Sequence, residues 1–252
     1  MSAASINNVI GKRFIELLRV DSTNNYAMQL AQKGVAFHGD AYFAFEQTEG
    51  KGQFSKKWLS TKGENIILSL VIDTSQLLLS QQFVLNMAAA ISVMQLFNKY
   101  TTEKINIKWP NDIYYRDRKA AGILIENVIR GSKWQFAIAG FGININQTSF
   151  SIDLKNPISL KQITGNSYNT VELAKELCGL FDENFKHLQS HNEKYIFDTY
   201  NNALYKRNES VAFKNNHSNF SGIVKGVDNL GKLVIENGTE QAYETGQLEW
   251  IL

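Results

Sequence analysis

Residues 108–144 read KWPNDIYYRDRKAAGILIENVIRGSKWQFAIAGFGIN, a stretch in which apolar runs alternate with cations, amides and glycines. Pro110 fixes its own backbone and disfavours helical geometry at the residue before it, so we expect Asn111 and Asp112 on a turn. Turns at strand ends carry binding and catalytic side chains more often than strand interiors do. We therefore predict that this stretch forms a binding or catalytic site on the surface of a β-sheet.

Two runs within this stretch have the composition of strands. The segments AAGILIENVI (120–129) and KWQFAIAGF (133–141) are rich in β-branched and aromatic residues. Gly131 and Ser132 between them form a favourable two-residue turn. We predict an antiparallel hairpin.

Small residues beside a cation mark one face of this hairpin. Lys119 precedes two alanines and Gly122 on the first strand. Gly140 and Gly142 leave similar room on the second strand, with Asn144 just beyond them. Because glycine lets a ligand approach the backbone closely, this face is the predicted binding surface.

The rest of the first 205 residues mixes strand and helix patterns. Apolar runs predict strands at 13–20, 41–46 and 66–73. Helical spacing predicts helices at 25–33, 82–100, 171–190 and 193–205, the first capped by Asp21, Ser22 or Thr23 and ended by Gly34. Residues 153–169 are expected to form a loop with a short helical turn. The pattern indicates an α+β domain.

Residues 47–65 form a long segment with three glycines, four lysines and almost no apolar content. A loop of this length inside a compact domain is usually functional or disordered. Gly50 and Gly52 free the backbone around Lys51, and Trp58 follows two further lysines. The segment is therefore a candidate lid over a phosphate and a flat ring, although a solvated lysine-rich loop anchored by a core tryptophan has the same composition.

The composition changes at residues 206–209. From there to residue 252 the sequence reads as short strands with turns, namely SVAF, FSGIVKGV, LGKLVIE and QAYETGQLEWI, with Asn237-Gly238 as the strongest hairpin signal. We predict a larger domain at 1–205 and a small SH3-like β-barrel at 206–252, which relies on the larger domain for stability and carries no visible site.

Composition limits the class of protein. The 252 residues carry 26 basic against 24 acidic side chains and a formal charge of +2, and 44% are hydrophobic. A chain of this kind can bury a full core, while its near balance of charge argues against a nucleic-acid surface. One cysteine excludes an internal disulfide, and the sequence shows neither a signal peptide nor a membrane-length apolar run. We expect a cytoplasmic protein.

Three side chains on the helix predicted at 171–190 and just after it have simple interpretations. Cys178 is expected to be a small buried hydrophobe. His187 and His191 share a face at four-residue spacing, which is a possible metal pair. With no third ligand nearby, we expect solvated histidines instead.

Taken together, the motifs resemble those of biotin protein ligases. The chain carries, in the order found in that family, DSTNN (21–25), GKGQFSKKW (50–58), KWPND (108–112), RKAAGIL (118–124) and GFGIN (140–144). Each is weak alone, but the last three in sequence are specific. The resemblance covers nearly the whole chain.

The resemblance implies a catalytic domain similar to that of class II aminoacyl-tRNA synthetases, with a mixed sheet and helices, followed by a small C-terminal β domain. It implies an ATP-dependent ligase that converts biotin to biotinyl-5′-AMP and then transfers the biotinyl group to a lysine of a biotin carboxyl carrier protein or domain. ATP and Mg²⁺ are the implied cofactors, and a homodimer formed through an edge strand is a further option. Because the sequence starts directly at the catalytic domain, it indicates the monofunctional type, with no DNA or membrane partner.

The same resemblance assigns residues. The biotin-binding set is Ser22, Thr23, Asn24, Gln47, Lys51, Gly122 and Lys119, and the nucleotide-binding set is Gly50, Gly52, Gln53, Lys56, Trp58, Lys108, Asn111, Gly142 and Asn144. Lys119 and Asp112 are the implied catalytic residues. Lys119 neutralises the biotin carboxylate and the α-phosphate, and Asp112 acts at the acceptor or the metal. No metal ligand is assigned beyond that, and Mg²⁺ is expected to arrive with ATP.

One departure from the family concerns the glycine loop, which is usually arginine-rich (GRGRRGRxW). Gln53 stands where the arginine associated with retaining the adenylate often lies, and lysine lacks the planar fork of arginine. Two alternative functions stay open. Lipoate ligases and octanoyltransferases share the fold and a central lysine, but their arginine-, glycine- and histidine-rich motifs are missing. A non-catalytic biotin sensor would keep the pocket, but retention of Lys119, Asn111 and Asp112 argues against it.

Overall fold

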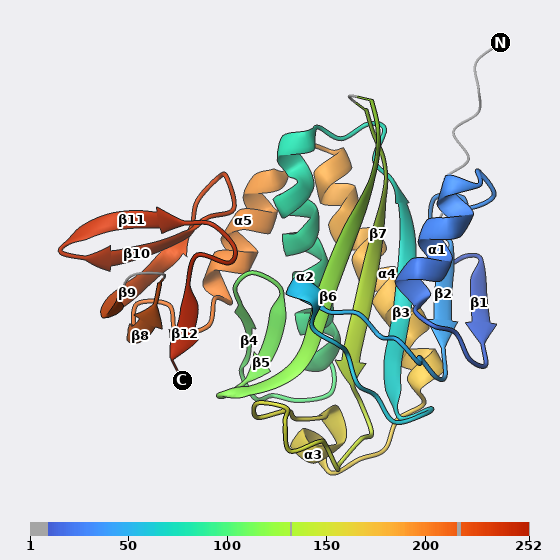
Figure 1. Ribbon diagram of the computed structural model, residues 1–252, viewed down its shortest axis with the longest axis horizontal. Helices are drawn as coiled ribbons and strands as arrows, with labels where there is room; N and C mark the ends of the chain where they lie inside the picture. Colours follow the sequence, from blue (N-terminus) through green and yellow to red (C-terminus); the bar gives the residue numbers. More distant parts are fainter. Residues whose placement is uncertain (1–9, 132, 216–217, 252) are drawn as a thin grey trace.

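A computed structural model describes residues 10–131, 133–215 and 218–251. Its larger part is a seven-stranded mixed sheet with the order β1-β2-β3-β7-β6-β5-β4, and its smaller part is a five-stranded antiparallel sheet. Figure 1 shows the two parts next to each other, with the small sheet beyond helix α5. The expected α+β fold with a small C-terminal β domain is confirmed.

The large sheet is antiparallel throughout except for the pairing of β1 with β2. Its strands are β1 (Phe14–Leu17), β2 (Ala41–Ala44), β3 (Asn65–Asp73), β4 (Ile105–Lys108), β5 (Asp112–Tyr115), β6 (Arg118–Arg130) and β7 (Lys133–Asn144). The predicted hairpin is β6 and β7, the longest pair in the sheet. Gly131 lies in its turn, and Ser132 lies outside the described residues.

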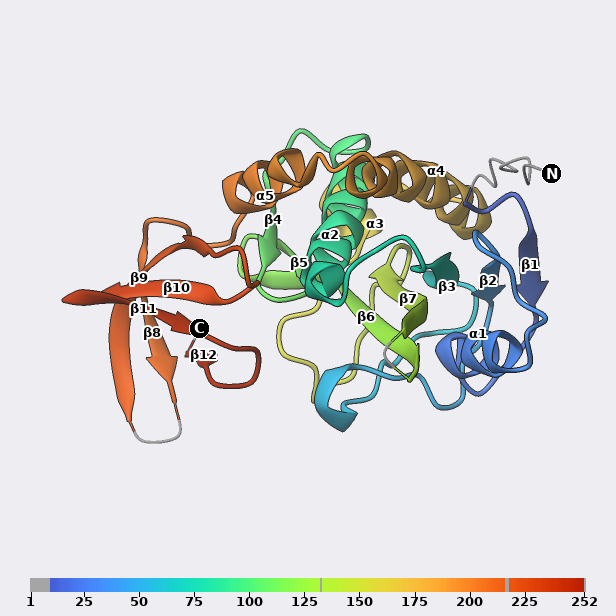
Figure 2. The same ribbon diagram turned by 90° about the horizontal axis from the view of Figure 1, so that it is seen from above.

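Helices cover the two faces unequally. The helices are α1 (Thr23–Gln32), α2 (Gln82–Asn98), α3 (Leu160–Thr164), α4 (Thr170–Gln189) and α5 (Glu193–Asn202), with 3₁₀ turns η1 (Gln53–Ser55) and η2 (Leu79–Gln81). Figure 2 shows α2, α4 and α5 on one face and α1 with η1 on the other. The face under α2, α4 and α5 is covered by apolar packing. The polar loops therefore lie on the opposite face of the sheet, with α1 and η1.

Helix α2 is apolar on every side because it lies between the sheet and helices α4 and α5. Its Met87 and Met94 are buried, as is Cys178 of α4, where burial raises the pKa of the thiol to about 12. The expectation of a small buried hydrophobe at Cys178 is confirmed. None of the helices in the described ranges is long and apolar enough to cross a membrane.

Several predicted bounds are wrong, and tertiary pairing explains two of them. The helix predicted at 193–205 ends at Asn202, because Ala203 and Tyr205 exchange backbone hydrogen bonds with Ile107 of β4. Asp112 starts a strand, β5, that was not predicted, and the turn consists of Trp109, Pro110 and Asn111. The strands predicted at 13–20 and 41–46 are shorter, ending at 17 and 44.

The small sheet has the order β11-β10-β9-β8-β12. Its strands are β8 (Ser210–Lys214), β9 (Asn219–Val227), β10 (Leu233–Asn237), β11 (Thr239–Tyr243) and β12 (Glu249–Ile251). The hairpin predicted at Asn237-Gly238 is confirmed. The run at 241–251, predicted as one strand, turns at Gly246, whose φ of 90° is accessible mainly to glycine. The boundary at residue 205 stays a prediction.

The two histidines near the end of α4 do not meet a metal-like cluster. The His187 ring stacks on Tyr195 with centroids 4.1 Å apart, and its Nδ1 lies 3.1 Å from Asn192 Nδ2. His191 has left-handed backbone geometry at the helix end. Within the described residues there is no group of three histidine, cysteine, aspartate or glutamate side chains that would hold a metal ion.

Candidate active site

A stripe of glycines on β6 and β7 holds the indole of Trp58. Gly122 and Gly142 are direct partners across the two strands. A Cβ atom built on Gly142 would lie 2.4 Å from Cε2 of Trp58, and one on Gly122 would lie 3.3 Å from Cζ3 of the same ring. Any side chain at Gly142 would therefore displace the indole. The glycines leave room on this face, as predicted, and Trp58 lies in it.

Lys119 and Asp112 meet at the end of this stripe. Lys119 Nζ lies 2.7 Å from Asp112 Oδ1 and 5.9 Å from the centroid of the Trp58 ring. The Lys119 backbone is fixed on both sides, since its N–H donates to Asn156 O and its carbonyl accepts from Ile158 N–H. The two predicted catalytic residues are therefore in direct contact, beside the predicted ring-binding residue.

A buried polar cluster forms the other end of the site, at the start of α1. Ser22 caps the helix by accepting from Asn25 N–H, which confirms the predicted N-cap. Thr23 N–H donates to Gln47 Oε1 at 2.7 Å. Ser69 Oγ lies 2.8 Å from Thr23 Oγ1 and 2.6 Å from Asn24 Oδ1. Three residues predicted to bind biotin, Thr23, Asn24 and Gln47, thus share one hydrogen-bond network through Ser69, and Ser22 lies next to it.

The glycine loop folds as a tight hairpin over the sheet. Gly52 N–H donates to Lys56 O, Trp58 N–H donates to Gly50 O, and Lys51 bridges Lys57. The segment predicted to lack structure therefore contains the 3₁₀ turn η1. The loop tip lies on the side of the sheet opposite α2, α4 and α5 (Figure 2), and its lysines are exposed.

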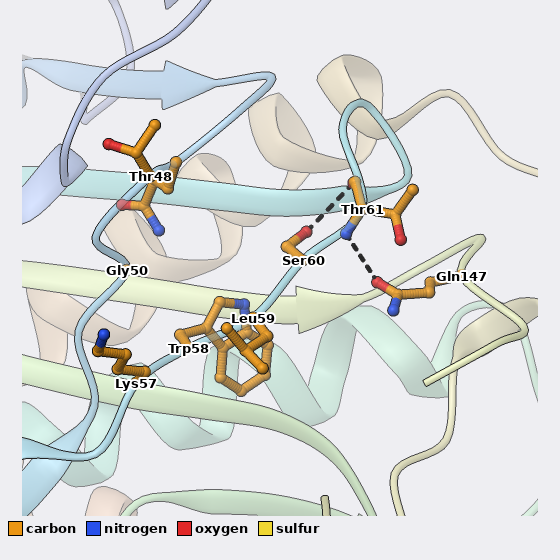
Figure 3. A pocket seen from close by; sticks show the side chains of 9 residues that line it. Thr48, Gly50, Lys57, Trp58, Leu59, Ser60, Thr61 and Gln147 are labelled. Atoms are coloured by element: carbon orange, nitrogen blue, oxygen red, sulfur yellow. Dashed lines mark hydrogen bonds between the residues drawn. The ribbon is translucent and has the colours of Figure 1, made fainter. Parts of the chain in front are cut away.

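An open pocket of about 250 Å³ lies beneath the base of this loop. Figure 3 shows its lining, where Thr61 N–H donates to Gln147 Oε1 and Trp58 lies above strand β7. Gln47 and Gly50 also line it. The pocket reaches Gln47 of the polar cluster and Trp58, and Lys119 is not among the residues that line it.

A family model described as the Biotin/lipoate A/B protein ligase family matches residues 17–144, more than half of the chain. The chain belongs to this family. The matched residues contain the polar cluster, the glycine loop, the Lys119–Asp112 pair and the glycine stripe, so the family's region of the chain is the one that builds the site.

Individual relatives in the ligase family agree with this assignment. The chain is 28% identical over 234 residues to a bifunctional ligase/repressor BirA from Bacillus spizizenii, covering 90% of this chain and 70% of the relative. It is 27% identical over 230 residues to a biotin–[acetyl-CoA-carboxylase] ligase from Paracoccus denitrificans, covering 87% and 92%. The solved biotin protein ligase from Aquifex aeolicus in complex with biotin and ATP has the same fold, with a TM-score of 0.81, 24% identity, and coverage of 95% and 99%.

Two amides that the family resemblance assigned to the nucleotide hold the strands in this structure. Asn111 Nδ2 donates to Ile123 O. Asn144 Nδ2 donates to Ile158 O at 3.2 Å and to Lys119 O at 3.4 Å. Both residues are more than nine-tenths buried. Their amide nitrogens are thus used to align the strands that carry Lys119, and any contact with a nucleotide falls to their remaining polar atoms.

Lys108 lies against the C-terminal domain of the ligase. Its Nζ lies 3.3 Å from Tyr114 Oη and 5.4 Å from the centroid of the Trp250 ring in β12. Burial is the main cause that lowers the pKa of Lys108 to about 8. The last strand of the small domain therefore contacts a predicted nucleotide-binding residue. The expectation that the small domain carries no visible site stays a prediction.

Three lysines and one carboxylate influence the charge of Lys108. Repulsion from Lys119, Lys155 and Lys56 adds to the lowering of the pKa of Lys108, and Asp112 opposes it. Lys56 comes from the glycine loop and Lys155 from the loop before α3. With Lys108 itself, these four lysines outnumber the one carboxylate, and the net positive charge suits a polyphosphate. Gln53, at the loop tip in η1, accepts a backbone hydrogen bond from Lys56 N–H at 3.1 Å.

Two residues of the site were missed from the sequence. Ser69, in the middle of the buried strand β3, joins Thr23 to Asn24. Glu126, on β6, accepts from Asn24 Nδ2 at 2.8 Å and lies 3.5 Å from Lys51 Nζ. In the sequence, the only indication that these residues belong to a site is that each is a single polar residue in an apolar run, Ser69 in IILSLVID and Glu126 after GILI.

Proposed function

We propose that this protein is a biotin protein ligase, which forms biotinyl-5′-AMP from biotin and ATP and transfers the biotinyl group to a lysine amine of a biotin carboxyl carrier protein or domain. The observation that carries the proposal is the arrangement of the site: a buried hydroxyl and amide cluster at one end, a lysine cluster at the other, and the Trp58-covered glycine stripe between them. The hydroxyl and amide cluster can form hydrogen bonds with the bicyclic urea of biotin, and the lysine cluster can neutralise the charge of a triphosphate.

In the first step, a biotin carboxylate oxygen attacks the α-phosphorus, and the bond to the β-phosphate breaks to release pyrophosphate. Both reactants are anions, so positive charge must lie where they meet. Lys119 is the cation fixed at that point, because its backbone is pinned on both sides. Lys108, Lys56 and Lys155 add charge for the phosphates. The contribution of the protein is therefore positioning and electrostatic stabilisation.

In the second step, the acceptor lysine amine attacks the acyl carbon and AMP leaves. The amine must lose a proton, and Asp112 is the carboxylate in contact with Lys119. We assign Asp112 to this amine or to the metal. Magnesium that is bound to ATP needs only one or two protein carboxylates, and Asp112 fits that modest requirement. The ion supplies charge neutralisation at the phosphates when it is bound.

Three further assignments belong to the same proposal. The partner is the carrier protein or domain of a biotin-dependent carboxylase, and the cytoplasm is the expected location because MgATP is supplied there. A homodimer formed at a sheet edge is tested by sedimentation with and without biotin. The names of the chain's relatives support biotin over lipoate as the substrate.

The transfer activity is tested by incubating the protein with biotin, MgATP and a purified carrier domain. Mass spectrometry should find one biotinyl group on one lysine of the carrier. Omission of ATP should abolish the modification. An unmodified carrier, together with retained adenylate formation, would show that the acceptor is a different protein.

The segment 48–57 is expected to open without ligand and to close over biotinyl-5′-AMP. Its tip buries little apolar area, so bound adenylate must offset the ordering entropy of about 1–2 kcal/mol per residue. Trypsin should cleave after the exposed Lys51, Lys56 and Lys57 about tenfold more slowly once biotin and MgATP are present. Closure of this kind would also shield the mixed anhydride from water.

The Lys119→Ala variant serves as the control for this protection experiment. It keeps the loop and its lysines unchanged but should not form the adenylate. Biotin and MgATP should therefore protect it much less than the wild-type protein. Equal cleavage of the wild-type loop with and without both ligands would rule out the lid.

A further inference from the structure

Glu126 occupies a central position in the polar network of the site. It lies on β6, on the same strand as Lys119 but seven residues further along. One carboxylate oxygen accepts from Asn24 Nδ2 at 2.8 Å, and the other lies 3.5 Å from Lys51 Nζ. The Glu126 side chain is 31% exposed, while Asn24 is 4% exposed. The carboxylate thus joins a buried amide to an exposed lysine of the glycine loop.

The network containing Glu126 begins and ends on the same segment of chain. It starts at Gln47, where the loop leaves β2, and passes through Thr23 and Ser69 to Asn24. From Asn24 it continues through Glu126 and returns to the loop at Lys51. Two points on the first arm of the loop, Gln47 and Lys51, are therefore tied to the sheet through polar groups.

The Asn24 amide has no freedom to find another arrangement. A Cβ atom on Gly140 would lie 2.2 Å from Asn24 Oδ1, so the side chain lies flat against β7. Its Nδ2 donates to Leu124 O as well as to Glu126. A fixed amide holds the Glu126 carboxylate in one place, and the carboxylate in turn offers Lys51 one fixed anionic partner.

We propose that Glu126 is a positioning residue of the ligase, which favours the closed position of the glycine loop by attracting Lys51 to the biotin pocket. The inference rests on the proposed function, because it gives Lys51 the role of a biotin-binding residue. Glu126 acts through Lys51 and does not contact the reacting atoms. An ion pair that favours the closed loop lowers the cost of ordering it when the ligand arrives, so the effect falls on biotin affinity.

The substitution Glu126→Gln separates the two contacts of this carboxylate. Glutamine keeps an oxygen that accepts from Asn24 but removes the charge that attracts Lys51. We expect the KM for biotin to rise about threefold to tenfold, since the ion pair is partly exposed. The kcat and the melting temperature should stay close to wild type. A lower KM would mean that Glu126 repels the biotin carboxylate and would overturn the inference.

A double-mutant cycle tests whether Glu126 acts through Lys51. Once Lys51→Gln has removed the cation, adding Glu126→Gln should raise the KM for biotin no further. Fully additive effects would contradict the proposal, since they would indicate a general structural role. The matched control is Glu176→Gln, which removes a carboxylate of similar exposure (28%) that pairs with Lys99 in the helical layer. Its KM for biotin should equal that of the wild-type protein.

Failure of the inference and failure of the proposed function give different results. A wild-type protein that forms no biotinyl-5′-AMP would contradict the proposed function itself. An active wild-type protein whose biotin KM is unaffected by Glu126→Gln would contradict only the role of Glu126.

Discussion

Lys119→Ala is expected to slow the formation of biotinyl-5′-AMP by about 10²–10³-fold, the usual cost of removing one donor that stabilises a transition state. Lys119 Nζ is fixed beside Asp112 and Trp58 at the point where the two anionic reactants must meet. Loss of the charge removes stabilisation that develops during the reaction, so kcat should fall more than biotin affinity does. Single-turnover assays of pyrophosphate release measure this rate.

Lys133→Ala provides a matched control for this result. Lys133 starts β7 at the far end of the same hairpin and is exposed. Its removal takes one positive charge from the same pair of strands and should leave the rate unchanged. A near wild-type rate for Lys119→Ala would show that the catalytic cation has been assigned wrongly.

Gly140→Ala is expected to lower the free energy of unfolding by about 2–6 kcal/mol. The new Cβ would lie 2.2 Å from Asn24 Oδ1, and overpacking of a core costs about 1–3 kcal/mol. Moving the buried amide would also leave hydrogen-bonding groups without partners, at a further cost of about 1–3 kcal/mol. Urea denaturation measures the first effect, and calorimetric titration should show that biotin binding is lost with it.

The same substitution at Gly179 is the control. Gly179 lies within α4, and a Cβ atom there would meet no atom within 4 Å. Gly179→Ala should raise helix stability by up to about 1 kcal/mol. If both variants had wild-type stability, the close contact between Gly140 and Asn24 would not exist in solution.

Local sequence patterns predicted the elements whose structure depends on neighbouring residues in the chain. The β6–β7 hairpin follows from its strand composition, and the Ser22 cap follows from an oxygen placed before a helix. The end of α5 could not be predicted this way, because Leu204 leaves the helix to pair with Ile107 almost one hundred residues earlier. That pairing competes with helix propensity only in the folded chain.

The site shows the same division between local and long-range information. The motifs named Lys119 and Asp112, and the fold brings the two side chains into contact because they lie on neighbouring strands of one sheet. Ser69 and Glu126 were not found, because each looks like an ordinary strand residue until the fold brings it to Asn24. Trp250 was missed for a similar reason, since its position over Lys108 depends on how the C-terminal domain docks.

Pyrophosphate release with biotin and with lipoate, each added with MgATP to the wild-type protein, tests the central claim most directly. The site combines a hydroxyl and amide cluster suited to a urea ring with a lysine cluster suited to phosphates, so biotin should trigger release of pyrophosphate and lipoate should not. Release with lipoate alone would contradict the account by assigning the pocket to a different acyl substrate. No release with either acid, together with tight biotin binding, would contradict it by identifying a sensor without catalytic activity.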